Sequence, residues 1–441
     1  MSSDFDGAAV PSTSRAASAL RDAFDAEWGR VVAAVMAAVR NWDLAEESAQ
    51  EAFARAAERW PADGVPARPG AWLTTVAKRH AIDRLRRTST EQTRMERLAV
   101  ATGERTAAPP DVGEAPVEDD LLALIYSCCH PALPVTGRVA LTLRTVLGLQ
   151  VEEIARALGV GDATMSQRIT RTKQKIRNAA VPLRMPAAHE LPDRTADVLA
   201  VTYLLFTEGH AATSGAELVR GDLCAEAVHL ARLLIGLMPD DPAPRDLLAL
   251  LLLTDARRPA RSTPDGDLVP LDEQDRTLWN AAATAEGLRL LDSTQRHAPP
   301  TRYRVQAEIA ACHARASSIA ETDWPRIVRS YEILLQDTPS PVIALNHAVA
   351  VAMRDGPDAG LALIEPLEAA GLLAEHHLLP ATRADLQRRA GRTEQAAAAY
   401  SDALALARTG PERRYLQRRV DELRGTGMGA APSRHRNVPG G

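Results

Sequence analysis

Apolar side chains recur at helical spacing in the segment from Gln150 to Lys175. They open it at Val151, Ile154, Ala155 and Leu158. Gly159 then stands where a sharp turn needs a residue without a β-carbon. Asp162 is in place to cap the helix that follows. The pattern predicts a helix, a tight turn and a second helix.

The second of these helices carries two rows of side chains. The row expected to face a core consists of Met165, Ile169, Thr172 and Ile176. The row expected to face outward consists of Thr164, Arg168, Arg171 and Lys175. Between Asp162 and Arg177 there are five basic residues and one acidic residue. An ordinary solvated helix can carry a basic row. The glycine turn, the polar residues near the N-terminus and the cations further along favour a DNA recognition helix.

Two more helices are predicted near the N-terminus. Residues 41–61 form an amphipathic helix whose negative face consists of Asp43, Glu46, Glu47 and Glu51. On a DNA-binding protein, such a face is expected to meet a protein partner and not phosphate. Residues 70–87 place an apolar row at Leu73, Ala77, Ala81 and Leu85, and cations at Lys78, Arg79, Arg84, Arg86 and Arg87. Together with Trp72, these cations suit melting DNA, because a ring can cover an unstacked base.

The composition of the chain favours an all-α fold. Of its 441 residues, 46% are hydrophobic and 4% aromatic, and the formal net charge is −5. This composition favours packed helices over β-sandwiches, and the net charge confines nucleic-acid contact to local basic patches. The cysteines indicate no disulfide framework and stand at Cys128, Cys129, Cys224 and Cys312. We find no signal peptide, and apolar runs such as Leu247 to Leu253 are too short to span a bilayer. A soluble cytoplasmic protein is expected.

Composition also divides the chain into parts. Residues 88–125 hold eight acids and three bases, with prolines and glycines but no period. A Pro-punctuated joint lies at 181–192. The expected parts are a disordered N-terminus (1–18), a helical unit (19–87), an acidic flexible linker (88–118), a helix-turn-helix unit (119–180), a helical extension (193–424) and a disordered tail (425–441).

The extension contains one segment with the spacing of a tetratricopeptide helix pair. This segment is GRTEQAAAAYSDALAL, with Gly391, Ala396, Tyr400 and Ala403 at the expected positions. Tyr331 lies 69 residues before Tyr400, and Gly356 lies 35 before Gly391. Stacked pairs would form a superhelix with a concave surface. A non-repeating α-bundle is the alternative.

The order of these features resembles extracytoplasmic-function (ECF) sigma factors of RNA polymerase, in the sigma-70 family. An acidic helix, the helix GAWLTTVAKRHAIDRLRR, a linker and a helix-turn-helix follow one another over residues 20–180. The resemblance implies that residues 20–87 are sigma region 2 and residues 120–178 are sigma region 4. It also implies core polymerase and promoter DNA as partners.

The resemblance assigns three sets of site residues. Region 4 would read the −35 element through Thr164, Ser166, Gln167, Arg168, Arg171 and Lys175. Region 2 would recognise and open the −10 element through Trp72, Lys78, Arg79, His80, Asp83, Arg84, Arg86 and Arg87. Region 2 would also contact core polymerase, at its β′ clamp helices and β subunit, through Asp43, Glu46, Glu47, Gln50, Glu51 and Phe53. The family usually reads R-N-R where this chain has Lys78, Arg79 and His80, which leaves the −10 sequence preference open.

The extension resembles one subgroup of these sigma factors, which carries a long tetratricopeptide-like C-terminal domain. The matching segments are SCCHPAL (127–133), VTYLLFTEGHAATSG (201–215), LVRGDLCAEAVHLARLL (218–234), VPLDEQDRTLW (269–279) and SPVIALNHAVAVAM (340–353). The subgroup implies that the extension regulates the sigma factor and is needed for its activity, with a regulatory protein as a further partner. Free protein is expected to bind promoter DNA poorly, because an unanchored linker gives little effective concentration.

A metal site, a ligand pocket and an enzyme active site find less support in the sequence. Cys128, Cys129 and His130 lack the spacing of a structural zinc site, so we interpret them as packed residues. Glu208, Gly209 and His210 are interpreted as the end of an apolar helix terminated by Gly209, with a ligand pocket as the alternative. No phosphate loop or nucleophile motif is present, so we expect no enzyme, no cofactor and no metal. The alternative function is a one-component helix-turn-helix transcription regulator with a helical sensor domain, which would have no need of residues 41–87.

Overall fold

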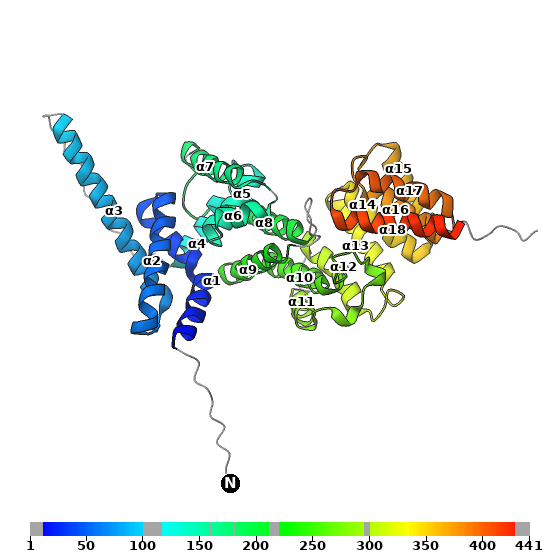
Figure 1. Cartoon of the computed structure of the whole chain (residues 1–441), viewed down its shortest axis with the longest axis horizontal. Coiled ribbons are helices and arrows are strands. Elements are labelled where there is room, and N and C mark those ends of the chain that lie inside the picture. The colour runs from blue at the N-terminus through cyan, green and yellow to red at the C-terminus, as the bar shows by residue number, and fades with distance from the viewer. Residues whose placement is uncertain are drawn as a thin grey trace, which may run out of the picture. The chain divides into compact units, whose positions relative to one another are not determined.

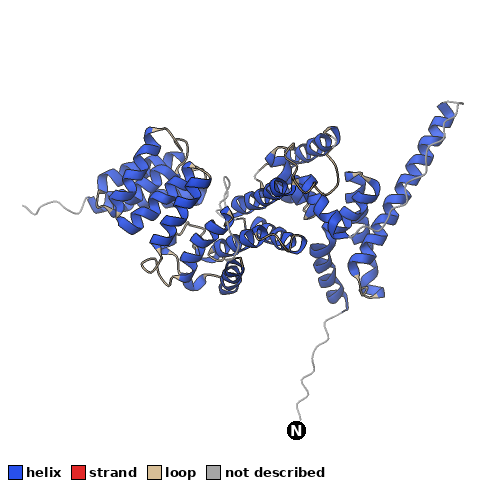
Figure 2. Cartoon of the chain, turned by 180° about the vertical axis from the view of Figure 1, so that it is seen from behind, coloured by secondary structure: helices blue, strands red, loops and turns tan. Residues whose placement is uncertain are grey.

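A computed structural model describes residues 12–99, 117–158, 160–179, 181–210, 220–294 and 300–427. Within these ranges every regular element is a helix, and the isolated β-bridge between Ser262 and Leu268 forms no strand (Figure 2). The predicted all-α fold is confirmed. The chain separates into two compact units, one ending at Thr202 and the other beginning at Tyr203. This boundary falls within one helix, α8.

The N-terminal unit begins with three long helices (Figure 1). They are α1 (Ser12–Val39), α2 (Trp42–Asp63) and α3 (Pro69–Ala99). The Asn41 side chain accepts a hydrogen bond from the backbone N–H of Leu44 and so caps the start of α2. Gly64 ends α2 with a φ of 85°, a conformation that glycine adopts without strain. Phe24, Trp28 and Phe53 pack between α1 and α2, with ring centroids 5.1 to 5.9 Å apart.

The helix-turn-helix belongs to a second group of helices in this unit. The group consists of α4 (Val117–Cys128), α5 (Val135–Leu141), the π-helix η1 (Thr142–Val146), α6 (Val151–Ala157), α7 (Asp162–Asn178) and α8 (Leu191–His210). The predicted helix-turn-helix is confirmed as α6 and α7. Gly159, the predicted turn residue, lies outside the described residues. Asp162 begins α7, but Gly161 is the residue at the cap position, so the prediction that Asp162 caps the helix is wrong.

Two predicted boundaries differ from the observed ones. Helix α1 begins at Ser12, inside the segment expected to be disordered, and α3 continues twelve residues beyond the predicted unit end, to Ala99. The part of α3 beyond residue 87 runs past α1 and α2 (Figure 1). Leu85, expected in the buried row, is accordingly 41% exposed, whereas Leu73, Ala77 and Ala81 are fully buried. Residues 1–11, 100–116 and 428–441 of the predicted disordered ends and linker lie outside the described residues.

The C-terminal unit continues from α8 as a succession of helices. They are α9 (Gly221–Leu237), α10 (Ala243–Asp255), the 3₁₀-helices η2 (Arg258–Ala260), η3 (Leu271–Glu273) and η4 (Arg276–Leu278), then α11 (Ala281–Ser293), α12 (Arg302–Arg315), α13 (Trp324–Asp337), α14 (Pro341–Asp355), α15 (Pro357–Ala369), α16 (Leu378–Arg389), α17 (Thr393–Leu406) and α18 (Gly410–Gly427). Each helix from α12 to α18 packs on its neighbour in the chain.

Neighbouring core clusters in this unit share helices. Side chains of α14 belong to one cluster with α12 and α13 and to another with α15 and α16. Helix α16 in turn contributes Ala384 to a cluster with α17 and α18. The predicted pair around Gly391 is present, because Gly391 turns the chain with a φ of 74° and Tyr400 is buried on α17. A series of core clusters in which each cluster shares a helix with the next is the packing expected of stacked repeats. Assignment to the tetratricopeptide class stays a prediction.

Candidate nucleic-acid interface

Helix α7 presents its polar row to solvent and buries its apolar row. Met165, Ile169 and Ile176 are at most 6% exposed, and Thr172 is buried with them. Five of the six residues expected to face DNA are exposed and the sixth, Arg168, is partly exposed; the exposed five are Thr164, Ser166, Gln167, Arg171 and Lys175. The predicted division of the helix is confirmed, and α7 has the surface that a recognition helix needs.

The close approach of α5 holds α7 in place. A β-carbon on Gly137 would lie 2.6 Å from the Thr172 hydroxyl, so only glycine fits at this crossing. Thr172 in turn donates a hydrogen bond to the backbone oxygen of Arg168 at 2.7 Å. At the start of α6 the backbone N–H of Gln150 donates to the Glu153 carboxylate at 2.7 Å, which satisfies one of the free N–H groups of the helix end. The contact between Gly137 and Thr172 therefore holds α7 close against α5.

The basic helix α3 carries the residues expected at the −10 element. Arg79, Asp83, Arg84, Arg86 and Arg87 are exposed and Lys78 is partly exposed. Trp72 is partly buried and packs edge-on against Trp60 of α2, with ring centroids 5.9 Å apart. That contact leaves only part of its ring to cover a base.

His80 is the last residue of the Lys78-Arg79-His80 triplet, where the family usually reads R-N-R, and it is attached to α2. Its Nδ1 lies 3.0 Å from the hydroxyl of Ser48, a residue that is fully buried. On the same face Arg84 makes an ion pair of 3.1 Å with Glu47. These contacts join the basic helix to the acidic one.

The acidic helix α2 does not point all its carboxylates at solvent. Asp43, Glu47 and Gln50 are exposed, and Glu51 is partly exposed and paired with Arg55 at 2.7 Å. Glu46, however, is 5% exposed, so its predicted place on an open face is wrong in this conformation. Phe53 is 7% exposed because it packs in the aromatic core with Phe24 and Trp28.

The Glu46 carboxylate is the centre of a polar cluster that joins α2 to the helix-turn-helix group. It accepts hydrogen bonds from the Thr145 hydroxyl at 2.9 Å and from Arg144 Nε at 3.2 Å. The ammonium group of Lys173, on α7, lies 3.0 Å from the same carboxylate. Lys173 also donates to Asp43 at 2.9 Å. We call Asp43, Glu46, Arg144, Thr145 and Lys173 the α2–α7 cluster.

Apolar and backbone contacts support the same junction. Trp28 Nε1 donates to the backbone oxygen of Thr145 at 3.2 Å. A β-carbon on Gly29 would lie 2.7 Å from the Val146 oxygen, and one on Gly148, whose φ is 79°, would lie 2.8 Å from the Phe24 ring. Helix α1 therefore lies so close to η1 that a side chain at Gly29 would collide with the backbone of η1. In this conformation the acidic and recognition helices form one packed body.

Lys173 is the residue of this junction that the sequence interpretation missed. It was counted among the cations of the recognition helix, yet it is 6% exposed. A signal was present, because Lys173 lies four residues after Ile169 and three before Ile176, on the flank of the buried row. Arg144 and Thr145 carried no such signal, since they lie in a short π-helix between apolar residues.

The cysteines of the SCCHPAL segment pack as expected. Cys128 and Cys129 are at most 1% exposed, and all four cysteines of the chain are free thiols. Burial raises the pKa of the Cys129 thiol to about 11. His130 Nδ1 accepts a hydrogen bond from the backbone of Ala132 at 3.1 Å. Their interpretation as packing residues agrees with this burial.

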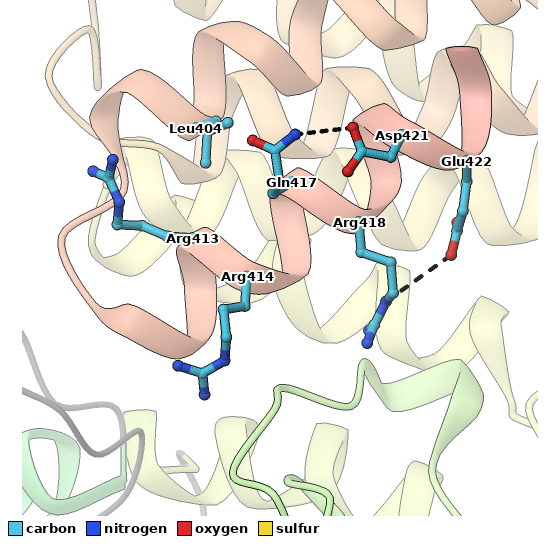
Figure 3. Close-up of a pocket in the computed structure, with 7 residues that line it drawn as sticks. All are labelled: Leu404, Arg413, Arg414, Gln417, Arg418, Asp421 and Glu422. Carbon is cyan, nitrogen blue, oxygen red and sulfur yellow. Dashed lines mark hydrogen bonds and ion pairs between the residues drawn. The ribbon is translucent and has the colours of Figure 1, made fainter. Parts of the chain in front are cut away.

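A shallow hollow on the C-terminal unit lies between α17 and α18. It is lined by Leu404, Arg413, Arg414, Gln417, Arg418, Asp421 and Glu422 (Figure 3). The arginines are largely engaged: Arg414 pairs with Asp267 at 2.5 Å, and Arg418 lies 3.8 Å from Asp267 and 3.9 Å from Glu422. The hollow is a surface charge network and offers no set of catalytic groups.

Comparison with known proteins supplies the families of three segments. Residues 24–91 match Sigma-70 region 2, and residues 123–176 match Sigma-70 region 4. Residues 194–295 match a family of unknown function, DUF6596. The two sigma matches cover the acidic helix, the N-terminal part of the basic helix and the helix-turn-helix.

Two kinds of relative were found. An uncharacterized protein of Rhizobium meliloti is 42% identical over 398 residues, which is 89% of this chain and 93% of the relative. A probable ECF RNA polymerase sigma factor of Mycobacterium tuberculosis, SigI, is 28% identical over 153 residues in the strains CDC 1551 and H37Rv. That match covers 34% of this chain and 52% of the relative. Among the helices described in the structure, none has the length and hydropathy needed to cross a membrane.

Proposed function

Because the chain belongs to the extracytoplasmic-function sigma factors of the sigma-70 family, we propose that it is closed before it binds polymerase and is controlled by its C-terminal extension. As a sigma factor it is an initiation subunit that acts with core RNA polymerase and promoter DNA. The observation that carries the proposal is the burial of Glu46 against Lys173, which joins region 2 to region 4.

The −35 element is bound by the exposed row of α7. The short side chains of Thr164 and Ser166 lie in its first turn, where a recognition helix meets base edges. Gln167 and Arg168 can make bidentate contacts with bases, and Arg171 and Lys175 lie further along for phosphates. The −10 element is bound by α3, where Lys78, Arg79, Arg84, Arg86 and Arg87 hold the backbone and Trp72, with His80 and Asp83 beside it, meets the melting strand.

Core polymerase binds the acidic face of α2 through the side chains that remain accessible. Glu47 and Gln50 are exposed and Asp43 keeps a side-chain exposure of 72% even while it pairs with Lys173. Glu46 joins this face only after region 4 has moved away. Binding to polymerase therefore competes with the α2–α7 cluster, because Glu46 must leave Lys173 before it can pair with the polymerase clamp.

Closure leads us to expect that free protein binds promoters poorly. In the closed form α3 and α7 belong to one packed body, so their spacing is set by the α2–α7 cluster and not by the promoter. Polymerase binding releases region 4 and allows the two DNA-binding helices to reach their separate elements. Closure is thus added to the expectation that a flexible linker weakens binding.

The extension is required for activity. Its support is the Rhizobium relative, which aligns with 89% of the chain and so retains the extension together with both sigma regions. The sequence places the start of the extension at residue 193, but α8 packs on the N-terminal unit up to Thr202. Asp197 pairs with Arg138 at 2.8 Å, and the Thr195 hydroxyl lies 2.8 Å from that of Tyr126. A truncation must therefore keep these residues.

Promoter-specific transcription by the full chain and by residues 1–202, each with core polymerase, tests the role of the extension. We expect residues 1–202 to bind core polymerase and to lose most promoter-specific transcription. Residues 1–192, which lack the α8 contacts, serve as a control for damage to region 4 and are expected to be less stable. Equal transcription by the full chain and by residues 1–202 would show that the extension is dispensable.

A further inference from the structure

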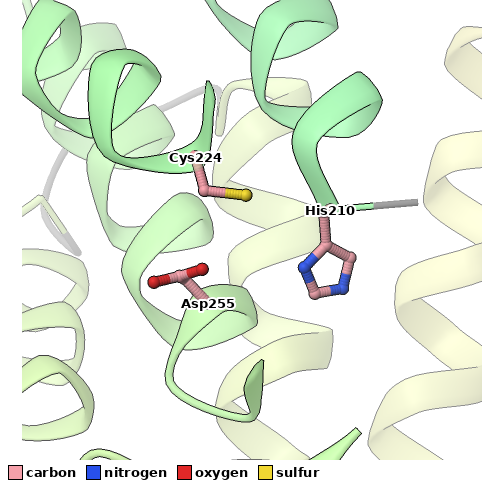
Figure 4. Close-up of side chains that lie close together, drawn as sticks. All are labelled: His210, Cys224 and Asp255. Atoms are coloured by element: carbon pink, nitrogen blue, oxygen red, sulfur yellow. The ribbon is translucent and has the colours of Figure 1, made fainter. Parts of the chain in front are cut away.

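Three side chains that can bind a metal ion meet in the C-terminal unit, outside the surfaces described above. His210 stands at the end of α8, Cys224 in the first turn of α9 and Asp255 at the end of α10 (Figure 4). Their ligand atoms, a ring nitrogen, the Sγ and a carboxylate oxygen, all lie within 4.8 Å of one another. They come from three helices, and no part of the proposed transcription mechanism uses them.

One polar atom of this group lacks any partner. The Asp255 carboxylate has the Cys224 thiol as a hydrogen-bonding neighbour within the group, whereas His210 Nδ1 is buried and makes no hydrogen bond. A buried polar atom without a partner costs about 1–3 kcal/mol, so this nitrogen requires an explanation. Cys224 is fully buried beside both residues. A bound cation would satisfy the nitrogen and the carboxylate at once, because a carboxylate oxygen and a neutral imidazole nitrogen are both lone-pair donors.

The surroundings hold the three groups in place as an outer shell holds metal ligands. Arg258 lies 3.4 Å from Asp255 Oδ2, which leaves Oδ1 directed at the other two groups. Arg261 donates to the backbone oxygen of His210 at 2.5 Å, and the His210 ring stacks on Phe206 with centroids 5.4 Å apart.

Gly209 brings the first two helices together. A β-carbon there would lie 2.8 Å from the backbone nitrogen of Cys224, and the Gly209 oxygen accepts a hydrogen bond from Arg220 N–H at 2.7 Å. Gly209 lies within α8 and does not terminate it, so its predicted role as a helix stop is replaced by close packing. The segment interpreted as a helix end, with a ligand pocket as the alternative, thus places His210 directly over Cys224.

We propose that His210, Cys224 and Asp255 form a zinc site that ties together the ends of α8, α9 and α10. Sulfur, nitrogen and oxygen ligands together favour Zn²⁺, and three protein ligands leave the fourth tetrahedral position to water. Zn–S and Zn–N bonds of about 2.3 and 2.1 Å place neighbouring ligand atoms about 3.5 Å apart. The observed group must therefore contract by about 1 Å, which rotation of the three side chains can supply.

The protonation states set the stoichiometry of binding. A neutral imidazole has a free lone pair on one ring nitrogen, which His210 can offer to the ion. Cys224 is a free cysteine, so the empty site holds a thiol. Binding forms the Zn–S bond, breaks the S–H bond and releases one proton to solvent. The bound group is then neutral, with Zn²⁺ balanced by one thiolate and one carboxylate.

Metal binding to the full chain tests the proposal without any measurement of transcription. The metal-free chain is titrated with Co²⁺, whose bond to a thiolate gives a charge-transfer band in the near ultraviolet. We expect this band at one Co²⁺ per chain and its displacement by Zn²⁺. Absence of the band in the unaltered, folded chain would overturn the proposal, since a cluster held only by its own hydrogen bonds has no affinity for the ion.

Matched variants identify the ligands. Cys224→Ser is expected to abolish the band, and Asp255→Asn to weaken Zn²⁺ binding at least tenfold. Cys312→Ser is the control, because Cys312 is another buried free thiol in the same unit and lies in the core between α12 and α13. Far-ultraviolet circular dichroism checks that each variant is folded. An unchanged band in folded Cys224→Ser, or its loss in Cys312→Ser alone, would contradict the assignment.

Discussion

The carboxylate of Glu46 and the ammonium group of Lys173 lie 3.0 Å apart, one on the acidic helix of region 2 and the other on the recognition helix of region 4. Their side chains are only 7% and 8% exposed. A buried pair of this kind is costly to break, because removing one partner leaves the other charge without compensation. In the proposed function this pair acts as a lock between regions 2 and 4, and polymerase binding is expected to release region 4.

Glu46→Gln should loosen the contact between regions 2 and 4. The substitution keeps the size of the side chain but leaves Lys173 with Asp43 alone, so we expect a loss of about 3 kcal/mol in the free energy of opening. Native-state hydrogen exchange of α7 in the full chain measures it. Glu47→Gln is the control, because Glu47 pairs with Arg84 while both side chains are about half exposed, and should cost less than about 1 kcal/mol. Equal exchange in both variants would contradict the lock.

Glu47→Lys should weaken binding to core polymerase. Glu47 is exposed on the acidic face and takes no part in the α2–α7 cluster, so the change tests the interface apart from closure. We expect about a tenfold loss of affinity, mainly in the association rate at low salt. Asp63→Lys makes the same charge change at the far end of α2 and should have little effect. Unaltered polymerase binding by Glu47→Lys would remove Glu47 from the interface.

Arg168→Ala should weaken recognition of the −35 element by about 1–3 kcal/mol if the guanidinium contacts a base bidentately. Holoenzyme binding to promoters with native and scrambled −35 elements gives the measurement. Lys175→Ala is the matched comparison, since a phosphate contact is expected to lower binding to both DNAs alike and to reduce the salt slope by about 1. Equal losses on both DNAs from Arg168→Ala would assign Arg168 to phosphate as well.

Acid should destabilise the C-terminal unit through His313. Burial, with Arg257 and Arg276 nearby, lowers the pKa of this histidine to about 3, below its unfolded value of about 6.5. The unfolded chain therefore binds the proton first, and the stabilisation present above about pH 6.5 is lost as the pH falls towards 3.

The loss attributable to His313 is about 1.4 kcal/mol per pH unit in that window. His313→Phe should reduce the pH dependence by one proton while it keeps the edge contact with Trp324. Hydrogen exchange of α12 and α13 in the metal-free chain, compared at pH 7 and 5.5, measures the difference. The control His229→Phe removes a partly exposed histidine from the same unit. An identical pH dependence in His313→Phe and the unaltered chain would rule out this account.

The spacing of apolar residues in the sequence predicted which side chains of a single helix are buried and which are exposed. Met165, Ile169 and Ile176 proved buried and Thr164, Arg171 and Lys175 exposed, because a helix with two distinct rows has one way to face a core. The same reasoning identified the acidic and basic helices of region 2 and their order. The resemblance to ECF sigma factors then followed from the order of the motifs.

Contacts between distant segments were not predictable in the same way. Glu46 and Lys173 are 127 residues apart, and a buried charge looks like an exposed one in the sequence until its partner is known. The end of α3 was missed for a different reason. Residues 88–99 are rich in Thr and have no apolar period, so they were interpreted as linker, yet they continue a helix already begun. The meeting of His210, Cys224 and Asp255 likewise depends on three helix ends that no sequence spacing brings together.

Transcription reconstituted from core polymerase and the purified full chain tests the central claim most directly. Genomic promoter fragments are transcribed with and without the chain, and duplex binding by the chain alone is measured on the same fragments. The account predicts promoter-specific transcripts that require the chain, together with weak duplex binding by the chain alone. The absence of such transcripts, combined with tight and specific duplex binding by the free chain, would contradict it and identify a one-component regulator.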